Sequence, residues 1–497
     1  TSTFLIIGNT YAEDNASQRW VVALQPADGS KPMVLGEAFY SDDGKPYRGQ
    51  INASRQNGNP GRVAGDKRPG AVNFMTGAEA SPHAWPDFFN SDGRWSRGMD
   101  RGTDGRYGVV QVFSLNPNTL QQTPLTKVLD VNLGRLPDGS TPANKPEISR
   151  FGGELACLDN GNFVVVVDDR SNLIAPFRAP TAVIVAPNGT ILKETFEIGT
   201  ESEQIWSNVA AYQGGFVARF KGVLWFYDNE GNLKGTVDQD TSSGEQFDRG
   251  RGDGTRIAAH INSPYVFLAG KVRTADAVML VAWDARNQSF VAKTEVSEAT
   301  FPGNVDRVNL AVDALNRVTV VWECKVPGYE SGQYHTAARV LALDPTAKKI
   351  TPLTKSFLPF FNSAHPAAKR ADSLIRIYRP TVSMTTKQIM VAAKGEINSE
   401  LKPELNIDTP KEVNFYVVIT HPAPAEDPTP GVGGPAPTLG IRLNGNSVII
   451  SWSPAVSGWV VQSTDSLSAP NWVDVGTANP TVVTIGPGTK FYRLRRQ

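Results

Sequence analysis

The sequence predicts an all-β protein: a seven-bladed β-propeller of four-stranded antiparallel blades, followed by a small C-terminal β-sandwich. Three observations predict it. Glycine (45) and proline (35) are plentiful, and no long helical period separates the turns that they mark. A pattern of four short apolar runs recurs along residues 1–420. A Pro/Gly-rich linker at 421–438 then separates this region from residues 439–497.

The clearest repeat unit runs from Arg150 to Gly199. Its apolar runs predict strands at 154–158, 163–167, 181–186 and 191–198, and the turns "LDNGN" and "APNG" join them in pairs. Asn-Gly between two apolar runs is a strong hairpin signal, because glycine readily adopts the positive φ that such turns need. The segment is therefore predicted to be an antiparallel meander of four strands.

Six other segments show the same pattern. Their starting points are Thr3, Arg62, Asn208, Arg256, Arg307 and Arg379. A unit of this kind buries its faces only against its neighbours, so a closed ring of seven is the expected arrangement.

The two terminal units are predicted to be incomplete. The first begins at what corresponds to a second strand, and the last supplies three strands. Two explanations stay open. Either the terminal strands are assigned in the wrong register, or another chain supplies a strand, because unpaired edges invite such pairing.

Composition and charge exclude some partners. Lys plus Arg and Asp plus Glu number 49 each, so the net charge is zero and gives no long-range attraction to nucleic acid. No apolar run is long enough to cross a bilayer, so no transmembrane segment is expected. The chain opens on Thr1 rather than Met, which predicts a processed protein that is secreted and lies outside the cell or at its surface.

The C-terminal segment 439–497 predicts six short strands. It is small for a sandwich and would gain stability by packing against a partner. We therefore interpret it as an assembly or anchoring domain. Its core candidates, which are also its candidate assembly residues, are Trp452, Trp459 and Trp472.

At this point the sequence resembles a known group. "NPGRVAGDKRPGAVNF", "RFGGELACLDNGNFVVVVDDRS", "FDRGRGDGTRIA" and "KGEINS" resemble segments of secreted propeller proteins from environmental bacteria of the verrucomicrobial and planctomycete kind. "GWVVQSTDSL" and "NWVDV" in the tail are similar to the small fibronectin-like domain that ends many of their exported proteins. The resemblance covers nearly the whole chain and implies fold and export, but no catalytic residue.

No catalytic constellation is found, so the prediction is a protein that is not an enzyme and has no cofactor. The sialidase box, the Gly-His and Trp-Asp signature, the kelch pattern and Gly-x-Ser-x-Gly are all missing from the sequence. Cys157 and Cys324 are predicted to be buried small residues rather than a disulfide. No metal-ligand spacing joins the histidines His83, His260, His335, His365 and His421.

Five arginines form the candidate ligand-binding set, because each is predicted just before the innermost strand of a blade. Such positions converge on one rim of the central channel, where guanidinium groups bind carboxylates or sulfates. The alternative is that each arginine pairs with a carboxylate of a neighbouring blade, such as Glu154, Asp253 or Asp306. The set comprises Arg62, Arg150, Arg256, Arg307 and Arg379.

Structural calcium is a second possible ligand, since aspartates supply hard oxygen atoms. The alternative is that these residues only form turns, because neither group matches a known calcium loop. The candidates are Asp92, Asp100 and Asp104, and Asp159 with Asp168 and Asp169.

Two functional hypotheses follow. The first is a secreted structural protein that assembles with copies of itself, as a filament or surface layer, through its tail and its incomplete blades. The second is an extracellular protein that binds or acts on polysaccharide through the arginine rim and an aromatic-rich insertion. The aromatic residues of that insertion are Trp85, Phe88, Phe89 and Trp95.

Overall fold

The structure is a computed structural model in which the chain divides into two compact units, Thr1–Pro428 (unit 1) and Thr429–Gln497 (unit 2). The boundary lies within the predicted linker. The residues described are 3–11, 18–26, 33–35, 62–65, 67, 74–80, 107–115, 122–132, 154–167, 181–198, 208–220, 222–247, 254–303, 307–325, 335–360, 375–397, 412–425, 438–453, 459–467, 470–486 and 488–496.

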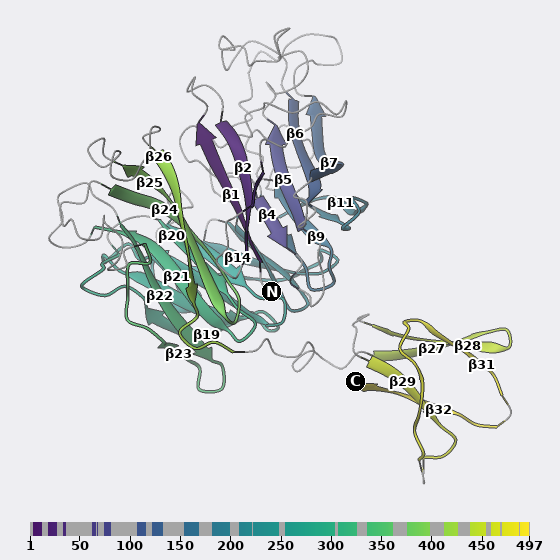
Figure 1. Ribbon diagram of the computed structural model, residues 1–497. Coiled ribbons are helices and arrows are strands. Elements are labelled where there is room, and N and C mark those ends of the chain that lie inside the picture. Colours follow the sequence, from purple (N-terminus) through teal and green to yellow (C-terminus); the bar gives the residue numbers. More distant parts are fainter. Residues whose placement is uncertain are drawn as a thin grey trace, which may run out of the picture. The chain divides into compact units, whose positions relative to one another are not determined.

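The described residues of unit 1 form seven antiparallel sheets that follow one another along the chain (Figure 1). The first consists of β1 (Thr3–Tyr11), β2 (Gln18–Pro26) and β3 (Met33–Leu35). The second consists of β4 (Arg62–Gly65), β5 (Phe74–Ala80), β6 (Tyr107–Leu115) and β7 (Gln122–Asn132). The third consists of β8 (Glu154–Cys157), β9 (Phe163–Val167), β10 (Thr181–Val185) and β11 (Ile191–Glu197).

The remaining four sheets of unit 1 repeat this order. The fourth consists of β12 (Asn208–Tyr212), β13 (Gly215–Phe220), β14 (Val223–Asp228) and β15 (Leu233–Asp238). The fifth consists of β16 (Thr255–Ala259), β17 (Tyr265–Lys271), β18 (Val278–Asp284) and β19 (Ser289–Glu295). The sixth consists of β20 (Val308–Val312), β21 (Arg317–Cys324), β22 (His335–Asp344) and β23 (Lys349–Pro352). The seventh consists of β24 (Ile375–Met384), β25 (Gln388–Ile397) and β26 (Glu412–Thr420).

The first and last sheets have three strands in the part of the chain that is described, and the five between them have four. Within the described residues, the two terminal units thus show three strands each, in line with the sequence prediction. The four strands predicted in residues 150–199 are also confirmed to within one residue at each end. Their two Asn-Gly turns place Gly161 and Gly189 at φ values of 88° and 91°, as the hairpin prediction requires.

Aspartates close the outer hairpins of three successive sheets by the same local chemistry. Asp228, Asp284 and Asp344 each end the third strand of a sheet. Each carboxylate accepts a backbone N–H two to four residues further on, at 2.7 to 3.0 Å. Such turns satisfy backbone donors that the strand ladder leaves unpaired.

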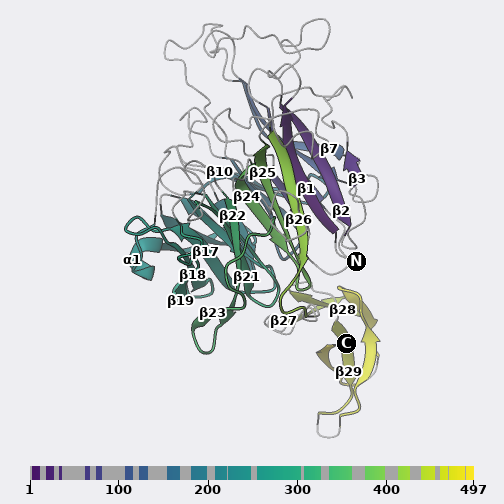
Figure 2. The same cartoon turned by 60° about the vertical axis from the view of Figure 1, so that its left-hand side comes forward.

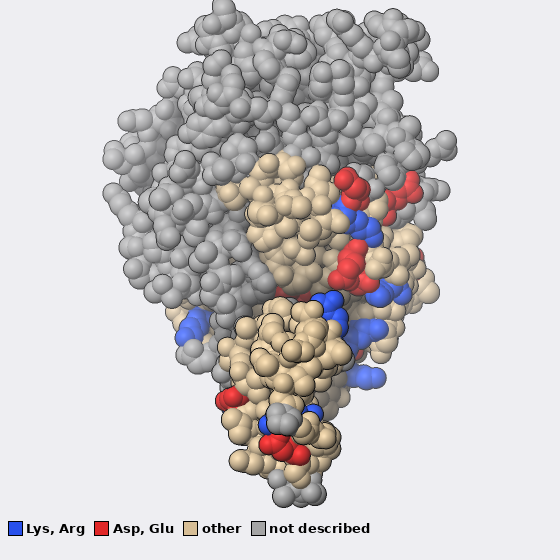
Figure 3. All heavy atoms as spheres, turned by 90° about the vertical axis from the view of Figure 1, so that its right-hand side faces the viewer, with Lys and Arg blue, Asp and Glu red and all other residues tan. Residues whose placement is uncertain are grey.

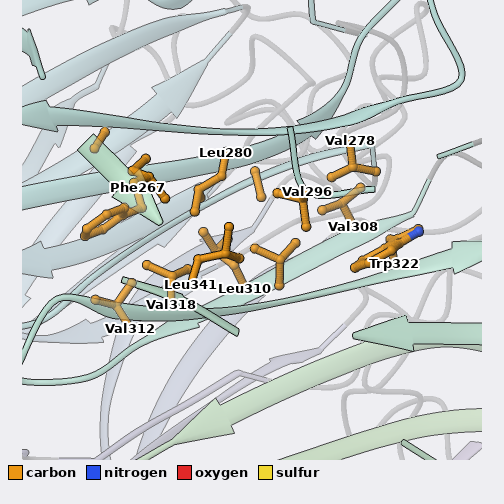
Figure 4. Packing of buried hydrophobic residues seen from close by; sticks show 14 of the residues in the cluster. Phe267, Val278, Leu280, Val296, Val308, Leu310, Val312, Val318, Trp322 and Leu341 are labelled. Atoms are coloured by element: carbon orange, nitrogen blue, oxygen red, sulfur yellow. The ribbon is translucent and has the colours of Figure 1, made fainter. Parts of the chain in front are cut away.

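Successive sheets pack face to face, which is the β-propeller arrangement. The first strands contact one another in the order β4, β8, β12, β16, β20 and β24. A hydrophobic cluster fills each interface from the second sheet to the seventh. Between the fifth and sixth sheets it includes Phe267, Leu280, Leu310, Val318 and Trp322 (Figure 4).

The one helix in the described residues is α1 (Gln239–Ser243), a single turn that follows β15 at the edge of unit 1 (Figure 2). Asp238 caps its N-terminus by accepting the N–H of Thr241. It packs beside β19, whose Lys293 donates a hydrogen bond to the carbonyl of Ser243 (2.9 Å). Within the described residues, no helix is long and apolar enough to cross a membrane.

Unit 2 contains six described strands in two antiparallel sheets of three. One sheet has the order β27–β28–β31, and the other has the order β30–β29–β32. A single hydrophobic cluster, with Ile450, Trp452 and Val461 at its centre, takes side chains from both sheets. The strands are β27 (Thr438–Asn444), β28 (Ser447–Ser453), β29 (Trp459–Thr464), β30 (Val473–Gly476), β31 (Thr481–Thr484) and β32 (Phe491–Arg496).

Candidate functional site

The predicted arginine set lies at or within first strands, but not at equivalent positions. Arg307 directly precedes β20, as predicted. Arg62 and Arg256 are the first and second residues of their strands, and Arg379 lies well inside β24, beside a register shift. The prediction that all five precede their strands is therefore wrong, because these strands begin earlier than their apolar residues suggest. Arg150 lies outside the described residues.

Arg307 has a carboxylate partner. Its guanidinium Nη1 lies 3.4 Å from Oε1 of Glu323, a carboxylate whose side chain is 5% exposed. This partner lies on the same sheet as Arg307. The register explains this: Val308 is opposite Trp322, so the next pair along the ladder brings Arg307 to Glu323. Arg256 is half-buried on β16.

The turns that join the first and second strands form a series of contacts between sheets. Asp159, in the turn after β8, accepts the N–H of Gly214 (2.7 Å) and the side-chain amide of Asn229 (2.6 Å), both in the next sheet. Gln213 donates its N–H to the carbonyl of Ser263 in the following sheet (2.9 Å). The Ser263 hydroxyl in turn hydrogen-bonds the Asn316 side chain of the sixth sheet. Four consecutive sheets are thus linked through equivalent turns.

These contacts give Asp159 a structural role, in line with the turn-forming alternative to calcium binding. Among the described residues, no three acidic, histidine or cysteine side chains gather as metal ligands would. The other calcium candidates lie outside the described residues, as do the four aromatic residues of the insertion. Calcium binding there stays a prediction.

Arg317 extends the series to the seventh sheet. Its side chain is 8% exposed and pairs with Asp313, which is fully buried, at 2.6 Å. Its Nη2 also donates to the carbonyl of Thr386 (2.7 Å), and its Nη1 donates to the carbonyl of Ala423. One guanidinium therefore holds the sixth sheet, the β24–β25 turn and the segment after β26 together.

The residues after β26 pack against unit 1, although the sequence assigns them to the linker. His421 donates its N–H to Lys387 (2.8 Å), and Ala425 donates to Thr386 (3.1 Å). The imidazole of His421 is buried and accepts the N–H of Ala423 at Nδ1 (3.0 Å). Burial and the Arg317 guanidinium lower the pKa of His421, although Asp313 and the Ala423 N–H oppose the shift. The neutral imidazole is therefore the form that fits this site.

His260 directly follows β16, the first strand of the fifth sheet. Burial, with a smaller effect from the charge of Lys67, lowers its pKa to about 3. Its Nδ1 accepts the N–H of Asn262 (3.2 Å), so it serves the turn. Lys67 itself is accessible to solvent, although desolvation by the protein around it lowers its pKa.

Two further predictions concern buried side chains. Cys157 and Cys324 are buried, unbridged thiols, as predicted. His335 is also buried, and burial lowers its pKa to about 4. His83 and His365 lie outside the described residues.

The three tail tryptophans differ in position. Trp452 is 4% exposed in the core of unit 2, and Trp459 packs against that core. Trp472 is partly exposed, with the Arg493 guanidinium 4.1 Å from its ring centre, a cation–π contact. Trp452 therefore stabilises the tail itself and offers no surface for assembly.

Comparisons with known proteins find similarity in structure only. No known protein family and no curated protein sequence matches this chain. Among solved structures, the β-propeller domain of the Trilobed protease from Pyrococcus furiosus matches with a TM-score of 0.38 and 8% identity, over 86% of this chain and 95% of that one. Apo AztD from Citrobacter koseri matches with a TM-score of 0.35 and 11% identity, over 84% and 97%. At these values the similarity carries no argument about activity or ligand.

The described surface carries charges of both signs close together (Figure 3). One such pair is Arg339 with Glu298 at 2.9 Å, which joins the sixth sheet to the fifth. Sequence reasoning missed the contacts between turns altogether. The available signal was a polar residue within two positions of the end of four first strands: Asp159, Gln213, His260 and Asp313.

Proposed function

We propose that this chain is a secreted structural protein, not an enzyme, that assembles with copies of itself, and that unit 1 is a seven-bladed propeller. The observation that carries the proposal is the three-stranded sheet at each end of unit 1, beside five four-stranded ones in the described residues. A strand without a neighbour presents unpaired backbone donors and acceptors to solvent. Another copy can satisfy them, because main-chain pairing needs no particular side chain.

We further propose that unit 2 is a fibronectin-like sandwich that serves assembly. Two sheets of three strands around one small cluster support this interpretation. A domain of this size has little core, so it gains stability when it docks. Because the chain has a net charge of zero, its copies do not repel one another, so charge does not oppose association.

Binding of an acidic polysaccharide by the arginine set receives less support. Arg307 already has a carboxylate partner in Glu323. If the arginines served a ligand, Arg256→Ala would weaken binding to a sulfated or carboxylated glycan. Under the assembly proposal the same variant assembles as the wild type does.

The test is electron microscopy of negatively stained full-length protein and of a chain that ends at Pro428. This truncation keeps His421 and Ala425, which bond to unit 1. We expect regular filaments or sheets of the full chain that are lost with unit 2. Separate particles of uniform size in both samples would refute self-assembly.

A further inference from the structure

Part of the core-facing side of the tail's first sheet is left uncovered. Residues opposite each other in antiparallel strands point to the same side of the sheet. Ile441 is opposite Ile450, and Leu443 is opposite Val448. Ile450 and Val448 belong to the core of unit 2, so Ile441 and Leu443 point to the core side. They are nevertheless 52% and 68% exposed.

The last strand of that sheet extends the uncovered surface. Val483 packs against the core of unit 2. Ile485, two residues further on, continues the ladder by donating its N–H to Asn446 (2.9 Å), and alternation places it on the side of Val483. It is 49% exposed. We call Ile441, Leu443 and Ile485 the apolar face of the tail.

Exposed apolar side chains are concentrated in unit 2. Of the twelve large apolar residues exposed within the described part of the chain, six belong to this unit. Unit 2 is only about one seventh of the sequence. A concentration of exposed apolar side chains is typical of surfaces that contact other proteins.

β27 borders the apolar face as an edge strand. In the part of the chain that is described, it pairs with β28 alone. It has seven residues without proline, its ladder with β28 has no register shift, and Arg442 is its single charge. Proteins usually protect edge strands with proline, bulges or inward-pointing charges. β27 has none of these, so it is suited to pair with another strand.

β26 offers a matching edge in unit 1. It is the third strand of its sheet, and within the described residues no fourth strand pairs with it. In the five four-stranded sheets, by contrast, a fourth strand pairs with the third. β26 has nine residues, and its Tyr416 is 42% exposed.

The charges of the two units are complementary. Residues 429–497 contain five basic and two acidic residues, while residues 1–428 contain 44 basic and 47 acidic ones. Unit 2 therefore carries a formal charge of +3 and unit 1 a charge of −3, within a neutral chain. The tail of one copy is thus attracted to unit 1 of another.

We propose that β27 of one copy adds to β26 in a second copy, at the edge that no strand of the described residues pairs with. It acts there as a fourth strand and buries the apolar face of the tail against that copy. The inference rests on the proposed self-assembly and names the joint. Because donor and acceptor are different surfaces of the chain, the contact is head-to-tail and extends into a filament unless it closes into a ring.

The first experiment is sedimentation velocity of the full chain over a range of concentrations. Leu443→Glu places a charge on the apolar face, and Leu192→Glu, at a residue of unit 1 that is 53% exposed, is the matched control. We expect the wild type and Leu192→Glu to assemble alike. For Leu443→Glu, we expect the protein concentration at half assembly to rise about tenfold or more.

The second experiment is cross-linking, which requires no destabilising change. Both native cysteines are buried, so new surface thiols react selectively. Arg442→Cys and Tyr416→Cys proteins are mixed and oxidised, and a covalent dimer is expected in the mixture but not in either protein alone. Assembly of wild type and Leu443→Glu alike, without the mixed dimer, would overturn this joint and leave self-assembly standing. A wild type that is monomeric at every concentration would overturn both.

Discussion

Replacing Arg317 by methionine tests the buried contact that joins the last two sheets. The change keeps the apolar stem of the side chain and removes the guanidinium from Asp313, whose side chain is fully buried. Breaking a buried ion pair from one side costs roughly 3–5 kcal/mol. Asp313 keeps two backbone N–H donors at 2.9 Å, which favours the lower end of that range.

The carbonyls of Thr386 and Ala423 lose a charged donor as well. Each lost hydrogen bond from a charged donor adds roughly 1.5 kcal/mol or more. We therefore expect the free energy of unfolding of unit 1 to fall by about 6 kcal/mol. Urea unfolding followed by tryptophan fluorescence measures it, because Trp283 and Trp322 are fully buried in unit 1.

Arg286→Met is the matched control, since Arg286 also pairs with a turn aspartate but is 62% exposed. Exposed pairs contribute less than about 1 kcal/mol. Hydrogen exchange of the His421 and Ala425 amides should increase in Arg317→Met alone. If the two variants lose the same stability, Arg317 does not hold the sheets together and the reasoning is wrong.

Three other outcomes are expected. In the folded protein the pKa of His260 is about 3, below its ordinary value of 6.5. The free energy of unfolding should therefore fall by about 1.4 kcal/mol per pH unit as the pH is lowered from 6.5 towards 3. The variant His260→Asn should flatten the pH dependence of unfolding over this range. Burial raises the pKa of Cys324 to about 12, and Cys157 is 6% exposed. A thiol reagent should therefore label neither cysteine before the protein unfolds. Rapid labelling of the native protein would contradict their burial. A Cβ at Gly215 would lie 1.9 Å from a backbone oxygen, whereas a Cβ at Gly486 would have nothing within 4 Å. The variant Gly215→Ala should therefore destabilise unit 1 several times more than Gly486→Ala destabilises unit 2. Calorimetry of both variants measures the two effects.

Local patterns predicted the sheets well. The strands of residues 150–199 follow from apolar runs and Asn-Gly turns, and both signals act between neighbours in the chain. The incomplete terminal sheets were visible for the same reason. Arg379 was misplaced because β24 begins at Ile375 and continues past Pro380 through a register shift, which no apolar run marks.

Contacts between sheets lay beyond such reasoning. Arg317 reaches Thr386 and Ala423, which are 69 and 106 residues further along the chain. A lone arginine at the start of a strand gives no sign of partners at such a distance. Arg307 has a nearer partner in Glu323, 16 residues away, and the register of β20 and β21, which the sequence does not define, brings the two together.

The segment 421–425 determines how a pulling force would enter the molecule. A load on the tail first meets the hydrogen bonds of His421, Ala423 and Ala425 to the preceding turns, before it reaches β26. Those bonds must break before β26 can be peeled from β25 strand end first. Arg317, held by Asp313, thus transfers part of such a load to the sixth sheet, so the last sheet of unit 1 does not bear it alone.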